Sequence, residues 1–119
     1  MSKASPDDLD NVAIARRLRI LRHHIAGSEQ GSQVRFATRI GIEYRRWNNF
    51  ERGYPISRDM AVHLTRSIPG LTTDWLFLGR EDGLATKLQR ELTEAGKAVT
   101  LAEETASGSS RNRSTRSRM

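Results

Sequence analysis

The sequence predicts an all-α fold, a compact five-helix domain with a helix-turn-helix, plus a possible sixth helix and a disordered basic C-terminal tail. Apolar residues recur at helical spacing from Val12 to Leu78. Glycine and proline interrupt this periodicity, which indicates short helices joined by turns. Residues 33–53 have apolar anchors on both sides of Gly41, the spacing needed by two short helices that meet at a sharp turn.

The first helix is predicted over residues 11–26, after a polar and flexible N-terminus at residues 1–10. Its apolar stripe has helical period and consists of Ile14, Leu18, Leu21 and Ile25. Four arginines lie off this stripe: Arg16, Arg17, Arg19 and Arg22. We interpret them as a solvated helix face, and phosphate contact is the alternative.

The next segment, residues 27–32, is a loop by composition. Ser32 stands where an N-cap is needed, because its hydroxyl can accept from backbone N–H groups at the start of a helix over residues 33–40. That helix should bury Ala37, Ile40 and either Val34 or Phe36. Gly41 can adopt a positive φ, so it ends the helix and forms the turn.

A third helix is predicted over residues 43–52, with Trp47 and Phe50 as inward anchors. The same helix carries donor-rich side chains, namely Tyr44, Arg45, Arg46, Asn48 and Asn49. Arginine and asparagine can pair with base edges in a DNA groove, so we interpret this face as a DNA contact. The alternative is that these residues form only a polar helix face. We expect Glu51 to bond within the motif, because a carboxylate pointing outward would repel phosphate.

Two further helices complete the predicted domain, residues 11–80. Ser57 should cap a helix with the apolar stripe Met60, Ala61, Leu64 and Ile68. Thr72 should cap a short helix whose Trp75 belongs to the core. Residues 81–105 are a linker or an amphipathic helix, and Leu84, Leu88 and Leu92 share one face of it. Residues 106–119 have nothing to bury and are predicted to be a disordered tail.

The distribution of charge favours a polyanionic partner. The formal net charge is +6, and residues 33–53 carry five arginines against Glu43 and Glu51. Residues 107–119 add four arginines and no acid. We therefore expect the tail to make phosphate contacts that raise affinity without reading sequence.

Several functional classes find no support in the sequence. The chain has no cysteine, and its three histidines, His23, His24 and His63, lack metal-site spacing. No nucleophile–base set or phosphate-binding glycine loop is present, so we expect neither an enzyme nor a cofactor. No apolar run approaches the ~20 residues of a membrane span, and we expect a cytoplasmic protein without membrane contact.

Residues 12–79 resemble the Cro and phage-repressor type of helix-turn-helix, the XRE-like family. The resemblance is carried by Gln33, Ala37, Gly41, Ile42, Trp47 and the segment 50–53, and residues 71–76 look like the family's final short helix. The loop at 27–32 is longer than is usual in the family, and Trp47 and Phe50 are bulkier than its customary aliphatic residues.

The resemblance implies a lambda-repressor-like DNA-binding domain that acts as a transcriptional regulator and homodimer on double-stranded DNA. It implies base contacts by Tyr44, Arg45, Arg46 and Asn49. Contacts to the DNA backbone are expected from Ser32, Gln33, Asn48 and Arg52, with the N-terminus of the helix at 33–40 offering N–H groups to phosphate. The alternative function is an antitoxin-like or adaptor module that binds a protein partner through residues 84–105.

Overall fold

The computed structural model describes the backbone of residues 6–117 and the side chains of residues 11–105. Within that range the chain contains six helices and no strand. They are α1 (Pro6–Ala26), α2 (Ser32–Ile40), α3 (Tyr44–Glu51), α4 (Arg58–Ser67), α5 (Thr73–Leu78) and α6 (Thr86–Ser117). The predicted all-α class and the sixth helix are confirmed.

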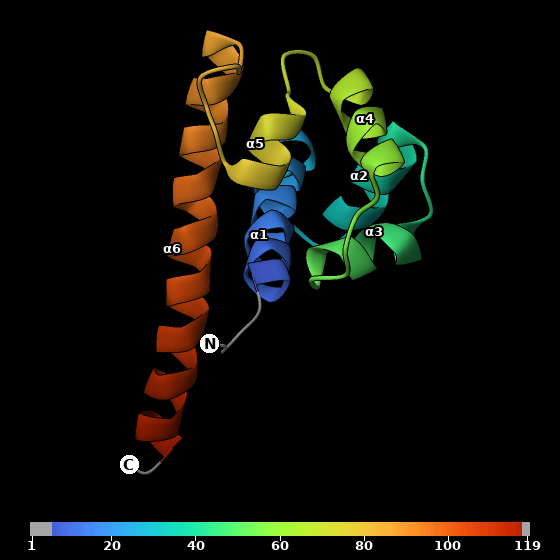
Figure 1. Ribbon diagram of the computed structural model, residues 1–119. Coiled ribbons are helices and arrows are strands. Elements are labelled where there is room, and N and C mark those ends of the chain that lie inside the picture. Colours follow the sequence, from blue (N-terminus) through green and yellow to red (C-terminus); the bar gives the residue numbers. More distant parts are fainter. Residues whose placement is uncertain (1–5, 118–119) are drawn as a thin grey trace.

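Helix α1 is the central element, and it contacts α2, α3, α5 and α6. Figure 1 shows α6 running along one side of α1, with α2, α3 and α4 on the other side. Arg16 of α1 bonds to Thr100 of α6, whereas His24 lies 3.5 Å from Glu91. Because the numbering rises along one helix as it falls along the other, α1 and α6 are antiparallel.

One apolar core joins all six helices. Leu18 and Leu21 of the predicted α1 stripe are fully buried. Of the two candidates in α2, Phe36 is fully buried and Val34 is 47% exposed, so Phe36 is the core residue. Trp75 is buried, as predicted for a core residue.

The segment predicted as either a linker or an amphipathic helix is a turn followed by α6. Its apolar face is buried in the same core, through Leu84, Leu88, Leu92, Ala95 and Val99. Complete burial of a leucine contributes ~1.5–3 kcal/mol. The start of α6 is therefore an integral part of the domain.

Helix α1 begins five residues before the predicted Asn11. Proline is tolerated in the first turn of a helix, where its missing N–H costs nothing, and Pro6 opens this one. The remaining residues of the predicted N-terminus, 1–5, lie outside the described range.

Two of the three predicted N-caps are correct. Ser57 accepts a hydrogen bond from Met60 N at 3.0 Å, and Thr72 accepts one from Trp75 N at 3.1 Å. The prediction for Ser32 is wrong, because Gly31 caps α2 with φ 90°. Ser32 is instead the first helical residue, and its hydroxyl points inward to Arg22.

The predicted basic tail, residues 106–119, falls where the structure describes no side chains, and its disorder stays a prediction. Among the described helices, none has the length and apolar character needed to cross a membrane.

Candidate nucleic-acid interface

Helices α2 and α3 are joined by a short turn at Gly41, which has φ 79°. The N–H groups of Gly41 and Ile42 both donate to Ala37 O at 2.9 Å, which completes the end of α2. A Cβ at Gly41 would meet nothing within 4 Å, so the backbone conformation and not lack of space requires glycine. Ala37 is buried near this turn, as expected for a small residue where two helices meet.

The inner face of α3 is aromatic. Trp47 is fully buried and Phe50 nearly so. The ring of Trp47 lies 4.6 Å from that of Phe36 in α2, and 6.4 Å from Phe50 in an edge-to-face arrangement. Such pairs contribute ~0.5–1.5 kcal/mol beyond their buried area. The bulky anchors noted in the sequence thus hold α3 on α2.

A buried carboxylate fixes α3 to the two preceding helices. Arg22 of α1 donates from Nε and Nη2 to the two carboxylate oxygens of Glu51, both at 3.0 Å. Gln33 Nε2 donates to the same carboxylate at 3.0 Å, and Trp47 Nε1 at 2.5 Å. Arg22 Nη1 also donates to the Ser32 hydroxyl at 3.1 Å. We call this group the Glu51 cluster: Arg22, Ser32, Gln33, Trp47 and Glu51.

The Glu51 cluster satisfies a charge that would otherwise be costly. The Glu51 side chain is only 3% exposed, and no buried polar side-chain atom in the described part of the chain lacks a partner. The prediction that Glu51 bonds within the motif is confirmed.

Ser32 and Gln33, predicted to contact phosphate, have their side chains turned toward this cluster. Their hydroxyl and amide groups hold the fold together. A phosphate at this point would therefore meet the N–H groups of Gln33 and Val34 and not the Ser32 hydroxyl, and the N–H of Ser32 already donates to Glu29 O at 3.0 Å.

The outer face of α3 has a different character. At about 100° per residue, Arg45, Asn49 and Arg52 lie opposite the buried anchors. Arg45 and Arg52 are exposed, and Asn49 is half-buried. Within the described residues, no hydrogen bond or ion pair occupies the side chains of these three.

The other predicted contact residues flank this outer face. Tyr44 is 46% exposed and borders an open depression of about 420 Å³ next to the start of α2. Arg46 lies at the opposite edge, with its guanidinium carbon 5.8 Å from the centre of the Phe50 ring. Asn48 is half-buried between Tyr44 and Arg45 on the helical wheel.

The arginines of α1 do not form the predicted solvated face. Arg17 donates to Leu76 O at 2.8 Å, and Arg19 donates to Glu51 O at 2.9 Å. Helix α1 is surrounded by other helices, so its polar positions face the carbonyl ends of α5 and α3. These structural roles were missed because a single sequence does not show which helix is central.

Two of the three histidines have polar contacts within the fold. His63 Nε2 lies 2.5 Å from Ile40 O, and His24 is next to Glu91. The described residues contain no group of three side chains placed to hold a metal ion.

Comparison of the chain with protein-family models, with curated proteins and with solved structures found no match. The resemblance of residues 12–79 to XRE-like proteins therefore stays a prediction.

Proposed function

We propose that α2 and α3 form a helix-turn-helix, and that the protein is a transcriptional regulator that binds double-stranded DNA with α3 in the major groove. The main support is the division of α3 into two faces. Trp47, Phe50 and Glu51 are buried against the domain, whereas Arg45, Asn49 and Arg52 point away from it.

The chemistry of the outer face suits base readout. Arg45 can donate two hydrogen bonds to guanine, and Asn49 can pair with adenine, each contact worth ~1–3 kcal/mol of discrimination. Arg52, at the end of α3, is placed for a phosphate. Tyr44 and Arg46 lie at opposite edges, where they reach flanking bases or the adjoining backbone.

A fixed helix is needed for such contacts, and α3 has only eight residues. Isolated helices of this length are unstable in water. The Glu51 cluster and the aromatic contacts of Trp47 supply the anchoring that the helix lacks on its own. The outer side chains are thereby presented from a rigid base, which lowers the entropic cost of binding.

A recognition helix this short spans few base pairs. We therefore propose that the protein binds an inverted repeat as a homodimer. In that arrangement the two half-sites are ~34 Å apart, one turn of duplex.

The alternative is an antitoxin-like or adaptor protein that binds a partner through residues 84–105. Leu84, Leu88 and Leu92 are buried in this chain's own core, so a partner has to use the outer face of α6 or displace the helix. A stoichiometric partner lost on deletion of residues 84–105, with no duplex binding, would favour this alternative.

Selection from a pool of random DNA duplexes tests the proposal. The unmodified protein should enrich one sequence, and Arg45→Ala and Asn49→Ala should each lose selection at one position of it. Arg90→Ala, which removes an exposed arginine from α6, is the matched charge control and should retain the selected sequence. Unchanged selectivity in both α3 variants would contradict the assignment.

A further inference from the structure

The C-terminal part of α6 passes close to the end of α3. A single side chain of α1 lies between them: Arg19 Nη1 donates to Glu51 O at 2.9 Å, and Arg19 Nη2 donates to Glu103 Oε2 at 3.4 Å. Glu51 is the last residue of α3 and precedes Arg52, which we propose to contact phosphate. Only one guanidinium therefore separates α6 at Glu103 from the Arg52 end of α3.

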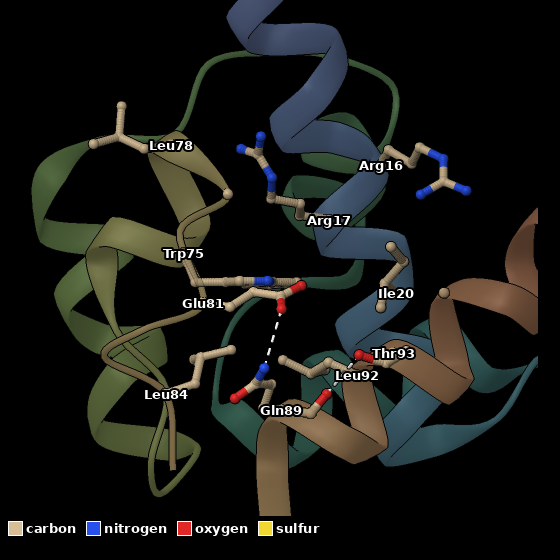
Figure 2. A pocket seen from close by; sticks show the side chains of 12 residues that line it. Arg16, Arg17, Ile20, Trp75, Leu78, Glu81, Leu84, Gln89, Leu92 and Thr93 are labelled. Atoms are coloured by element: carbon tan, nitrogen blue, oxygen red, sulfur yellow. Dashed lines mark hydrogen bonds between the residues drawn. The ribbon is translucent and has the colours of Figure 1, made fainter. Parts of the chain in front are cut away.

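Up to this point α6 is fixed on the domain. Its apolar face is buried in the core as far as Val99. Near its start, Gln89 Nε2 donates to Glu81 at 3.2 Å, a contact drawn in Figure 2. Arg16 of α1 bonds to the Thr100 hydroxyl, one turn before Glu103. The place where the chain leaves the domain is therefore fixed relative to α3.

Beyond Glu103 the backbone of α6 continues to Ser117. Figure 1 shows this last part, in red, extending past the N-terminal end of α1, at the end of the molecule where α3 lies. Residues 105–119 contain no acid and four arginines: Arg111, Arg113, Arg116 and Arg118.

These arginines are close enough in the chain to reach a duplex held by α3. Arg111 follows Glu103 by eight residues, which is ~12 Å along a helix or ~26 Å in an extended chain. Both distances are shorter than one turn of duplex, ~34 Å. A guanidinium donates two parallel hydrogen bonds to a phosphate and stays charged at neutral pH.

We propose that the four arginines of residues 106–119 contact the phosphates that flank each half-site on the Arg52 side of α3. This inference depends on the proposed function, since it places the tail on the duplex that α3 reads. The contacts release counterions and raise affinity, but they do not read bases. Because the tail starts beside one end of α3, its contacts lie on one side of the bases next to Arg45 and Asn49.

Salt dependence tests whether these contacts exist. One variant keeps the length of the tail and replaces its arginines: Arg111→Gln, Arg113→Gln, Arg116→Gln and Arg118→Gln. On a duplex obtained by selection, its slope of log K against log salt should be shallower than that of the unmodified protein by ~0.9 for each lost contact, so by up to ~3.6. The selected sequence should not change, and Arg90→Gln on the exposed face of α6 should keep the original slope.

Two negative outcomes are distinguishable. An equal slope for the tail variant and the unmodified protein would overturn the inference alone, and it is expected if these arginines pair with Asp7, Asp8 or Asp10 of the same chain. If the unmodified protein selected no duplex, the proposed function would fail, and this inference with it.

Directed cleavage of the duplex tests where the tail lies. The chain has no cysteine, so Ser114→Cys places a single thiol in the tail for an iron–EDTA label, and Ser28→Cys places one in the loop before α2. Ser28 lines the same depression as Tyr44, at the end of α3 opposite to Arg52. Within one half-site, the two labels should cut the DNA backbone on opposite sides of the selected bases. Cuts on the same side, or none from residue 114 while residue 28 cuts, would overturn the inference.

Discussion

The arginines of α1 and the arginines of α3 lie in different surroundings. Arg22 is 15% exposed and forms two bonds to a buried carboxylate, and Arg19 bonds to the last carbonyl of α3. Arg45 and Arg52 are exposed, and no other described residue forms a hydrogen bond or ion pair with their side chains. The first pair holds the fold together, and the second is the pair that we propose to contact DNA.

This difference shows that the number of arginines in a segment does not reveal which of them binds a ligand. The position of the helix in the bundle decides, because a central helix such as α1 meets the carbonyl ends and acids of its neighbours. A peripheral helix such as α3 has one face that meets nothing in its own chain. The following predictions test this contrast, beginning with the largest effect.

Arg22→Ala should destabilise the domain most. It leaves the Glu51 carboxylate buried without its cation, and breaking a buried pair in this way costs ~3–5 kcal/mol of the free energy of unfolding. Urea denaturation measures the change. Arg90→Ala, on an exposed position of α6, should change the same quantity by less than ~0.5 kcal/mol. A loss below ~1 kcal/mol for Arg22→Ala would show that the Glu51 cluster is not a structural anchor.

Arg45→Ala should show the opposite pattern. The free energy of unfolding should stay within ~0.5 kcal/mol of the unmodified protein, because the side chain is exposed. Discrimination between the selected duplex and its single-base variants should fall by ~1–3 kcal/mol at one position. Competition between the selected duplex and these variants for the protein measures this discrimination. Uniform weakening across all sequences would instead make Arg45 a phosphate contact.

Glu103→Gln should have a smaller effect. Glu103 lies 3.4 Å from Arg19 and 3.8 Å from Arg16, with both partners substantially exposed. Exposed ion pairs contribute ~0–1 kcal/mol and are screened by salt. Urea denaturation at low and high salt should show a small loss that shrinks as salt is added. A large loss independent of salt would mean that Arg16 and Arg19 depend on Glu103 for their positions.

The smallest expected effect is on the pKa of Glu29, which lies in the loop before α2. A hydrogen bond from its own backbone N–H, and then the Arg35 guanidinium 3.2 Å away, hold the pKa of this carboxyl below its ordinary value. Since the folded pKa is lowered, the stability it contributes is present above the unfolded pKa and is lost as the pH falls through the folded value. Arg35→Ala should raise the pKa of Glu29 part of the way in an NMR titration, whereas Arg39→Ala should leave it unchanged. Equal shifts in both variants would exclude a specific pair.

Much of the fold could be predicted from the sequence. The apolar stripe of α1, the glycine turn at Gly41 and the caps Ser57 and Thr72 follow from local periodicity and capping chemistry. The errors came from long-range contacts. Ser32 has the chemistry of a cap, but Arg22, ten residues earlier, attracts its hydroxyl inward.

The candidate site could be predicted less completely. The inward direction of Trp47 and Phe50 follows from the spacing of residues in α3, and that of Glu51 from the repulsion between an outward carboxylate and phosphate. The bond between Gln33 and Glu51 was not, since it requires the packing of α2 on α3. Likewise, the sequence leaves open whether Leu84 to Leu92 bind the domain or a partner, because an amphipathic helix suits both.

The central claim is that α3 presents its outer arginines to DNA while those of α1 serve the fold. The most direct test follows the side-chain Nε–H signals of the arginines by NMR as a duplex obtained by selection is added. We predict that Arg45 and Arg52 shift strongly and that Arg22, in the Glu51 cluster, does not. Shifts confined to the arginines of α1, or the absence of any duplex that binds, would contradict the account.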